Sequence, residues 1–249
     1  MPGTEAPDVT VLVPALNEED TIAEVVDRLL ALPITTQVIV IDDGSTDKTP
    51  KILETYKDRI LILTNAARGG KGAAIVKALP YAEGKVVIIQ DADLEYSPEE
   101  IPKVIDPILK GEASVVYGTR FAEGLPKSMA LANKAVNVLL AMTVRLAYFQ
   151  GITDEATCYK AVRRDLLVQM DLQCKRFEFC PEVTAKAIRL KQRIKEVPIH
   201  YEARSKAAGK KIRWTDAPEA FWTLLKYRFW RSRATAPAPV QPKLNGSQS

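Results

Sequence analysis

Two acidic residues two positions apart, Asp91 and Asp93, follow closely after the apolar run Val86–Ile89. When the chain turns after a strand, carboxylates spaced in this way can bind one hard divalent cation. Coordination positions then remain for the oxygens of a diphosphate. An Asp-x-Asp pair alone is common in loops, and its position at the end of a predicted strand is what makes it a candidate metal site. We therefore predict Mg²⁺ or Mn²⁺ at Asp91 and Asp93.

Polar segments also follow the first two apolar runs of the chain. Behind the second run, Asp42 or Asp43 could accept hydrogen bonds from a base or a ribose. The alternative is structural: the segment turns the chain and caps the next helix. Both interpretations can hold together. Pro14, Asn17 and Glu18 follow the first run and allow the same two interpretations.

A glycine-rich basic segment, Arg68-Gly69-Gly70-Lys71-Gly72, leads into a predicted helix. Its backbone N–H groups and Lys71 could hold a phosphate. The segment lacks the spacing of a Walker A loop, and no Ser or Thr follows the lysine. On its own it is a weak indication of phosphate binding.

Short apolar runs and the amphipathic segments between them predict an α/β fold. The predicted strands are Val9–Val13, Val38–Ile41, Ile60–Leu63, Val86–Ile89 and Ser114–Tyr117. Helices are expected to begin near Asn17, Asp47 and Gly70 and to span Pro98–Leu109. Strands this apolar are typically buried on both faces, so we expect a mostly parallel sheet with helices on both sides. Such sheets bind ligands at the carboxyl ends of their strands, where the polar segments lie.

The second half of the chain is less regular. The predicted helices are Lys127–Tyr148, Pro181–Leu190 and an amphipathic C-terminal helix over Asp216–Trp230, and the predicted strands are Thr157–Val162 and Ile194–Ile199. The segments Met129–Phe149 and Phe221–Trp230 are apolar with cationic flanks, so they either pack on the sheet or lie at a membrane surface. Residues 232–249 are rich in Pro, Ala and Ser, which predicts a disordered tail.

The composition is that of an ordinary globular protein, with 249 residues, 47% hydrophobic and 27% charged, and a formal net charge of +4. Three cysteines without CxxC spacing indicate reduced thiols in the cytoplasm. A single histidine argues against a Ser–His hydrolase. No run is long and apolar enough for a spanning helix, so we expect a cytoplasmic protein, soluble or peripheral on the membrane face. In the basic stretch Lys186–Arg233 we find no aromatic–basic interleaving of the kind that stacks bases, so nucleic acid is not an expected partner.

In order, the motifs PALNEE, VIVIDDGSTDKT, RGGKGAA, VVIIQDADLEY and VVYGTRF resemble those of family 2 glycosyltransferases over Val9–Phe121. The resemblance implies a single nucleotide-binding domain of the GT-A type over residues 1–231. Residues 9–121 would form its nucleotide-sugar half and residues 122–231 its acceptor half. The segment Asp154–Lys160 resembles one in polyprenyl-phosphate sugar synthases, with Cys158 standing where glycine is expected.

The resemblance also implies roles on the donor side. Residues near the nucleotide would be Pro14, Asn17, Glu18, Asp43 or Asp42, Lys71, Gln90 and Asp91. Asp91 and Asp93 would hold the metal on the diphosphate. A UDP- or GDP-hexose fits this set, and the sequence leaves the base and the sugar open.

On the acceptor side, the resemblance implies Arg120, Asp154 and Arg204 as catalytic candidates. Arg204, Lys210 and Lys211 would lie on a mobile basic loop that closes over the phosphates, where Lys210 and Lys211 would bind the donor. Asp154 could be a general base for a hydroxyl acceptor. If the acceptor is a lipid phosphate, which is already an anion, Asp154 would instead position groups or pair with a cation. A carboxylate that only caps a turn is the third interpretation.

These observations lead to one main hypothesis and two alternatives. The main hypothesis is an inverting transferase that moves a hexose from a nucleotide sugar to polyprenyl phosphate. The first alternative is an enzyme of the same fold with a soluble or protein-bound hydroxyl acceptor. The second, motivated by the basic C-terminal half, is a non-catalytic nucleotide or nucleic-acid binder.

Overall fold

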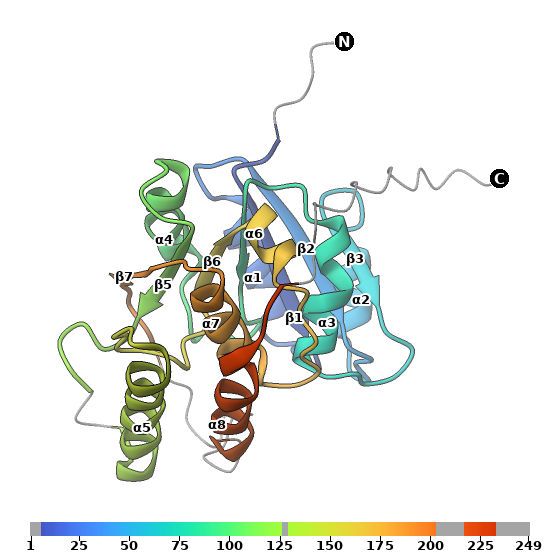
Figure 1. Ribbon diagram of the computed structural model, residues 1–249. Helices are drawn as coiled ribbons and strands as arrows, with labels where there is room; N and C mark the ends of the chain where they lie inside the picture. Colours follow the sequence, from blue (N-terminus) through green and yellow to red (C-terminus); the bar gives the residue numbers. More distant parts are fainter. Residues whose placement is uncertain (1–5, 126–128, 203–216, 233–249) are drawn as a thin grey trace.

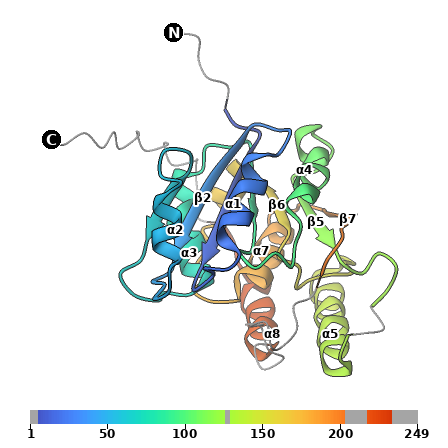
Figure 2. The same cartoon turned by 180° about the vertical axis from the view of Figure 1, so that it is seen from behind.

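The computed structural model describes residues 6–125, 129–202 and 217–232. Within them lies a seven-stranded sheet in the order β3-β2-β1-β4-β6-β5-β7. Helices cover both of its faces: α3 and α7 lie toward the viewer in Figure 1, and α1 and α2 lie toward the viewer in Figure 2. The predicted α/β architecture is confirmed.

The sheet is mostly parallel, as predicted. Its strands are β1 Val9–Ala15, β2 Thr36–Asp42, β3 Leu61–Thr64, β4 Val86–Ile89, β5 Val115–Thr119, β6 Lys160–Arg163 and β7 Ile194–Pro198. Only β6 among the strands of the described residues is antiparallel to its neighbours, β4 and β5. The strand expected over Thr157–Val162 begins later, at Lys160, because Thr157 and Cys158 belong to the turn that leads into it.

The helices follow the expected order with shifted ends. They are α1 Ile22–Leu30, α2 Thr49–Glu54, α3 Lys71–Ala78, α4 Ile101–Leu109, α5 Leu131–Tyr148, α6 Arg164–Gln169, α7 Phe179–Arg189 and α8 Ala217–Lys226. Short 3₁₀ turns occupy Leu79–Tyr81, Pro98–Glu100 and Tyr227–Phe229. The helix expected near Asn17 begins only at Ile22, since Asn17 has a positive φ of 53°. α6 was not predicted.

Burial explains why the apolar runs become strands. Every residue of β4 and of β5 is buried, which fits strands covered by helices on both faces. Leu12, Ile39 and Ile41 are fully buried in the adjacent strands. Truncating such a side chain to alanine costs about 2–5 kcal/mol. The core therefore fixes the carboxyl ends of β1, β2 and β4 relative to one another.

α5 and α8 run side by side and extend beyond the sheet in both views (Figures 1 and 2). The Tyr148 hydroxyl at the end of α5 donates to the carbonyl of Leu224 in α8. Within the described residues, no helix combines the length and the hydropathy needed to cross a membrane. The tail predicted over residues 232–249 lies, from residue 233 on, outside the described part.

Candidate functional site

The predicted site residues come together because β2, β1 and β4 are neighbours in the sheet. The register pairs Ala15 of β1 with Asp42 of β2, and Leu12 of β1 with Ile89 of β4. Since these strands are parallel, their carboxyl ends meet at one edge. The segments after the three strands, which carry the donor-side and metal candidates, therefore lie next to one another.

Backbone and side-chain hydrogen bonds join the first two of these segments. The Asn17 N–H donates to Ser45 Oγ at 2.9 Å, and Asn17 Oδ1 accepts from the Thr46 N–H at 2.8 Å. The Glu18 N–H donates to Thr49 Oγ1 at 2.9 Å. Asn17 and Glu18 therefore have a structural role between the two segments, and a role in nucleotide binding stays a prediction for Pro14, Asn17 and Glu18.

Asp43 anchors the glycine-rich segment. Its carboxylate accepts from the N–H groups of Gly69 and Gly70 at 2.8 Å each and from Asn65 Nδ2 at 2.7 Å. Gly70 has a φ of 97°, and a Cβ there would lie 2.5 Å from the carbonyl oxygen of Lys175. Only glycine fits such a position. Asp43 thus shapes the entry to α3, while Asp42 Oδ1 accepts from the Ser45 N–H at 3.0 Å. Binding of the base by either residue stays a prediction.

Lys71, the first residue of α3, pairs with Asp91. Its Nζ donates to Asp91 Oδ1, and it lies 3.3 Å from Cys158 Sγ. Burial alone would lower the pKa of Lys71, but the Asp91 carboxylate raises it well above its usual value. Burial and the same carboxylate raise the pKa of the Cys158 thiol. Lys71 is therefore a cation and Cys158 a neutral thiol at this point of the sheet edge.

Gln90 forms hydrogen bonds that hold the loop carrying Asp91 and Asp93. It is fully buried, and its Nε2 donates to the carbonyls of Asp91 and Tyr96 at 3.0 Å each. Its Oε1 accepts from the Tyr159 hydroxyl. These bonds occupy the amide within the protein, so the structure gives Gln90 a positioning role. Direct contact with a donor stays a prediction.

Asp91 and Asp93 are both partly exposed at the end of β4. Asp93 Oδ1 accepts from the Glu95 N–H at 3.1 Å, which closes the turn after the strand. Paired carboxylate oxygens at such a turn are the donor set that Mg²⁺ or Mn²⁺ prefers, so these residues fit the predicted ion. Among the described residues, no group of three or more acidic, His or Cys side chains could hold a metal. A donor diphosphate and water can supply further oxygen ligands.

Arg120 and Asp154 form a buried clamp beyond β5. The guanidinium donates to Asp154 through Nε and Nη2, both at 2.7 Å, and the Arg120 N–H donates to Asp154 Oδ2 at 3.0 Å. The Asp154 side chain is fully buried and that of Arg120 is 12% exposed. Burial opposes the charge of Arg120, but Tyr96 and Asp154 raise its pKa well above its usual value. Asp154 is thus paired with a cation, and its role in a reaction stays a prediction.

Two residues of this clamp escaped the sequence analysis. Glu196 in β7 accepts from the N–H groups of Thr153 and Asp154 at 2.9–3.0 Å, which fixes the turn that carries Asp154. The ring of Tyr201 lies 5.0 Å from the Arg120 guanidinium, and its hydroxyl donates to Glu95 Oε2 at 2.6 Å. Both partners are far along the chain, so no spacing pattern could reveal them.

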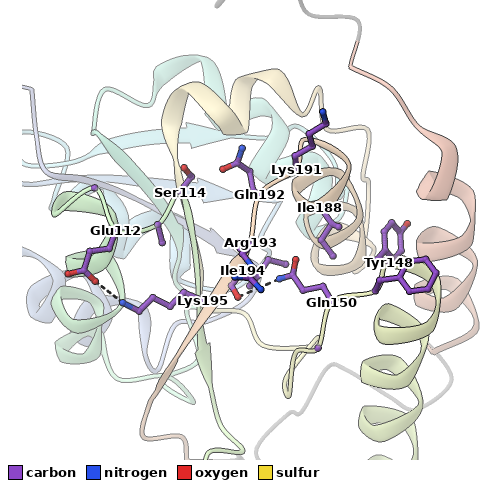
Figure 3. A pocket seen from close by; sticks show the side chains of 14 residues that line it. Glu112, Ser114, Tyr148, Gln150, Ile188, Lys191, Gln192, Arg193, Ile194 and Lys195 are labelled. Atoms are coloured by element: carbon purple, nitrogen blue, oxygen red, sulfur yellow. Dashed lines mark hydrogen bonds and ion pairs between the residues drawn. The ribbon is translucent and has the colours of Figure 1, made fainter.

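The remaining predictions for this site lie elsewhere. Arg204, Lys210 and Lys211 fall outside the described residues. A cavity of about 780 Å³ opens at the amino ends of β5 and β7, where Lys195 pairs with Glu112 and Tyr148 closes one side (Figure 3). None of the predicted site residues lines it.

Comparison with known proteins gives a consistent result. The family model described as glycosyl transferase family 2 matches residues 10–170. A low-salt glycan biosynthesis hexosyltransferase of Haloferax volcanii is 32% identical over 209 residues, which cover 82% of this chain and 50% of that protein. A dolichol-phosphate mannosyltransferase of Pyrococcus furiosus is 24% identical, over 81% of this chain and 58% of that protein. The chain thus spans little more than half the length of these two relatives.

Other relatives are matched over most of their length. A polyprenol monophosphomannose synthase of Mycolicibacterium smegmatis is 27% identical over 85% of each chain. Among solved structures, glucosyl-3-phosphoglycerate synthase from Mycobacterium tuberculosis, in complex with Mn²⁺, UDP and phosphoglyceric acid, aligns with a TM-score of 0.69. The alignment covers 91% of this chain and 80% of that one at 20% identity, which shows a shared fold.

Proposed function

The chain belongs to glycosyl transferase family 2, and on that premise we propose that it moves a hexose from a nucleotide-sugar donor to polyprenyl phosphate with inversion. The relatives whose names mention dolichol or polyprenol motivate this acceptor. The donor would bind across the carboxyl ends of β1, β2 and β4. Asn17, Glu18 and Asp42 or Asp43 would contact the nucleoside there.

In this proposal Asp91 and Asp93 hold Mg²⁺ or Mn²⁺ on the donor diphosphate. The ion would neutralise the negative charge that develops on the leaving nucleoside diphosphate. Lys71, at the amino end of α3, is placed to add a second positive charge at the same edge. The structural neighbour in complex with Mn²⁺ and UDP supports this assignment by analogy of fold.

On the acceptor side, Arg120 would bind the phosphate of the lipid. An oxygen of that phosphate forms a bond to the anomeric carbon while the bond from that carbon to the donor diphosphate breaks. The electron pair of the broken bond leaves with the nucleoside diphosphate. Because the attacking phosphate is already an anion, no proton has to be removed. Asp154, buried and bonded to Arg120, is then a positioning residue.

One observation carries the proposal: Tyr201 links the two halves of the site. It contacts the Arg120 guanidinium through its ring and donates through its hydroxyl to Glu95, two positions after Asp93. The Tyr96 ring packs on Tyr201 with centroids 5.0 Å apart. An anion held by Arg120 would therefore lie beside the loop that carries the metal candidates.

We also propose that α5 and α8 rest on a membrane surface. α5 exposes Leu131, Val138, Leu139, Met142 and Leu146, with exposed fractions of 44–82%. At 100° per residue these side chains fall within an arc of about 100°, opposite the face buried against the protein. α8 and the turn after it expose Trp222, Leu225 and Phe229. Arg145 and Lys226 lie on the same helices, as in helices that bind anionic lipid interfaces.

The test is transfer of radiolabelled sugar from a nucleotide sugar into an organic phase that contains polyprenyl phosphate. A panel of nucleoside diphosphates, screened by thermal shift with and without Mn²⁺, first identifies the base. We expect label in the organic phase only when donor, metal and lipid phosphate are all present. Label that stays in the aqueous phase on a soluble or protein acceptor would replace the lipid proposal with the hydroxyl-acceptor alternative.

A further inference from the structure

Lys71 forms an ion pair with Asp91, one of the two carboxylates of the proposed metal site. The segment before it is fixed, since Asp43 binds the N–H groups of Gly69 and Gly70. This geometry brings the start of α3 to the end of β4, where Nζ of Lys71 bonds to Asp91 Oδ1. The two side chains are only 16% and 18% exposed, so water screens the pair weakly.

The surroundings leave Lys71 with a single charged partner among its recorded contacts. Its other contact is the Cys158 side chain, whose Sγ lies 3.3 Å from Nζ. A thiol is a weak hydrogen-bond acceptor and cannot replace a carboxylate. A stronger anion brought close to α3 would therefore compete with Asp91 for the ammonium group.

The carboxylate pair is also a poor cation site by itself. The described residues supply no third acidic, His or Cys ligand around it. With Lys71 in place, a free divalent cation meets a carboxylate whose Oδ1 is already paired with an ammonium group, and that positive charge repels the cation. A donor diphosphate changes both conditions, because it brings new oxygen ligands for the cation and a new anionic partner for Lys71.

We propose that Lys71 is an internal counter-ion that closes the Asp91–Asp93 pair to free divalent cations and moves onto the donor diphosphate when donor and metal bind together. The inference rests on the proposed function, since it takes the same donor and the same metal. It adds a specificity rule: the protein binds its metal as a complex with the nucleotide. Metal affinity and nucleotide affinity are then thermodynamically coupled through Lys71.

The experiment is a Mn²⁺ titration followed by electron paramagnetic resonance, with and without the nucleoside diphosphate that the thermal-shift panel selects. We expect wild-type protein to bind Mn²⁺ weakly alone and about tenfold or more tightly with the nucleotide. Lys71→Met should bind Mn²⁺ alone about tenfold more tightly than wild type and lose most of the coupling. Lys71→Arg keeps the charge and should retain the low affinity for free Mn²⁺.

Lys110→Met is the matched control, because Lys110 forms an exposed pair with Asp106 on α4 and its loss changes the net charge equally. It should titrate like wild type. Equal or weaker binding of free Mn²⁺ by folded Lys71→Met, checked by circular dichroism, would overturn the proposal. If Asp91→Asn still binds Mn²⁺ with nucleotide as wild type does, the metal assignment in the proposed function is wrong. That outcome is distinct from a failure of the role proposed for Lys71.

Discussion

Arg120 and Asp154 share two parallel charge-assisted hydrogen bonds, Nε to Oδ2 and Nη2 to Oδ1, each 2.7 Å long. This fork-to-fork geometry fixes the plane of the guanidinium. The Arg120 N–H binds the same carboxylate, so main chain and side chain hold a single arrangement. Both carboxylate oxygens of Asp154 accept hydrogen bonds from Arg120, which leaves Asp154 poorly placed to take a proton from an acceptor.

Asp154→Asn tests this division of roles. The amide keeps the shape of the side chain but loses its charge and one acceptor oxygen, so Arg120 loses its fixed orientation. We expect kcat/KM for the acceptor to fall about 100-fold, while KM for the donor stays unchanged. The pH profile of the residual activity should keep its wild-type shape. A general base would behave differently, because its removal abolishes the acidic limb of that profile.

Asp91→Asn and Asp93→Asn test the metal site. Each variant should fold and lose activity by several orders of magnitude, since it removes a charged ligand of the cation. Asp106→Asn, at an exposed residue of α4, is the matched control and should retain full activity. The measurement is turnover at saturating Mn²⁺, with circular dichroism as the check on folding. Near-normal turnover of either variant would contradict the mechanism.

Glu155 predicts a pH dependence of stability. It is buried beside Lys160 and Thr184, and burial raises its pKa to about 7 from the usual 4.5, with Lys160 opposing the shift. The folded state therefore binds a proton that the unfolded state has already released. As pH rises from 4.5 to about 7, this group lowers the free energy of unfolding, by at most about 1.4 kcal/mol per pH unit.

Chemical denaturation of wild type and Glu155→Gln at several pH values measures this contribution. The variant should lack the fall between pH 4.5 and 7. Glu112→Gln serves as the control, because Glu112 forms an exposed pair with Lys195 and its loss should leave the slope unchanged. Identical slopes for Glu155→Gln and wild type would show that Glu155 is ionised throughout this range.

Leu146→Glu tests the membrane surface. Leu146 is 71% exposed on α5, so a charge there should weaken sedimentation with anionic lipid vesicles about tenfold or more. Transfer to a short-chain, water-soluble acceptor should be unaffected. Leu109→Glu, at a half-exposed residue of α4, is the control and should sediment like wild type. Equal vesicle binding by both variants would remove α5 from the proposed surface.

The local pattern of apolar residues was enough to predict the strands of the parallel part of the sheet. Val86–Ile89 was predicted to be a strand and is β4 with the same ends, because a run of buried β-branched residues has few alternatives. Asp91 and Asp93 could be singled out as metal candidates because they closely follow that run. The prediction for the helix near Asn17 was wrong at its start, since hydrogen bonds to Ser45 and Thr46 hold that residue in a loop.

Long-range contacts were beyond the reach of the sequence. α6 is only six residues long, so it shows too little periodicity to be recognised. The anchoring of Asp43 to Gly69 and Gly70 joins positions 26 and 27 apart, and Glu196 lies 42 positions from Asp154. Such pairs depend on the packing of the whole domain, and no local rule of spacing or propensity specifies them.

The reversed strand β6 has a consequence for how this protein could evolve. It lies between β4 and β5, pairing Val87 with Val162 and Val116 with Ala161. The sheet formed by the strands of residues 9–121 is thus completed by a strand from later in the chain. Cutting the chain after residue 121 would leave the inner edges of β4 and β5 bare. A second half taken from a relative would have to bring a strand that fits both edges, which couples sequence changes in the two parts of the chain.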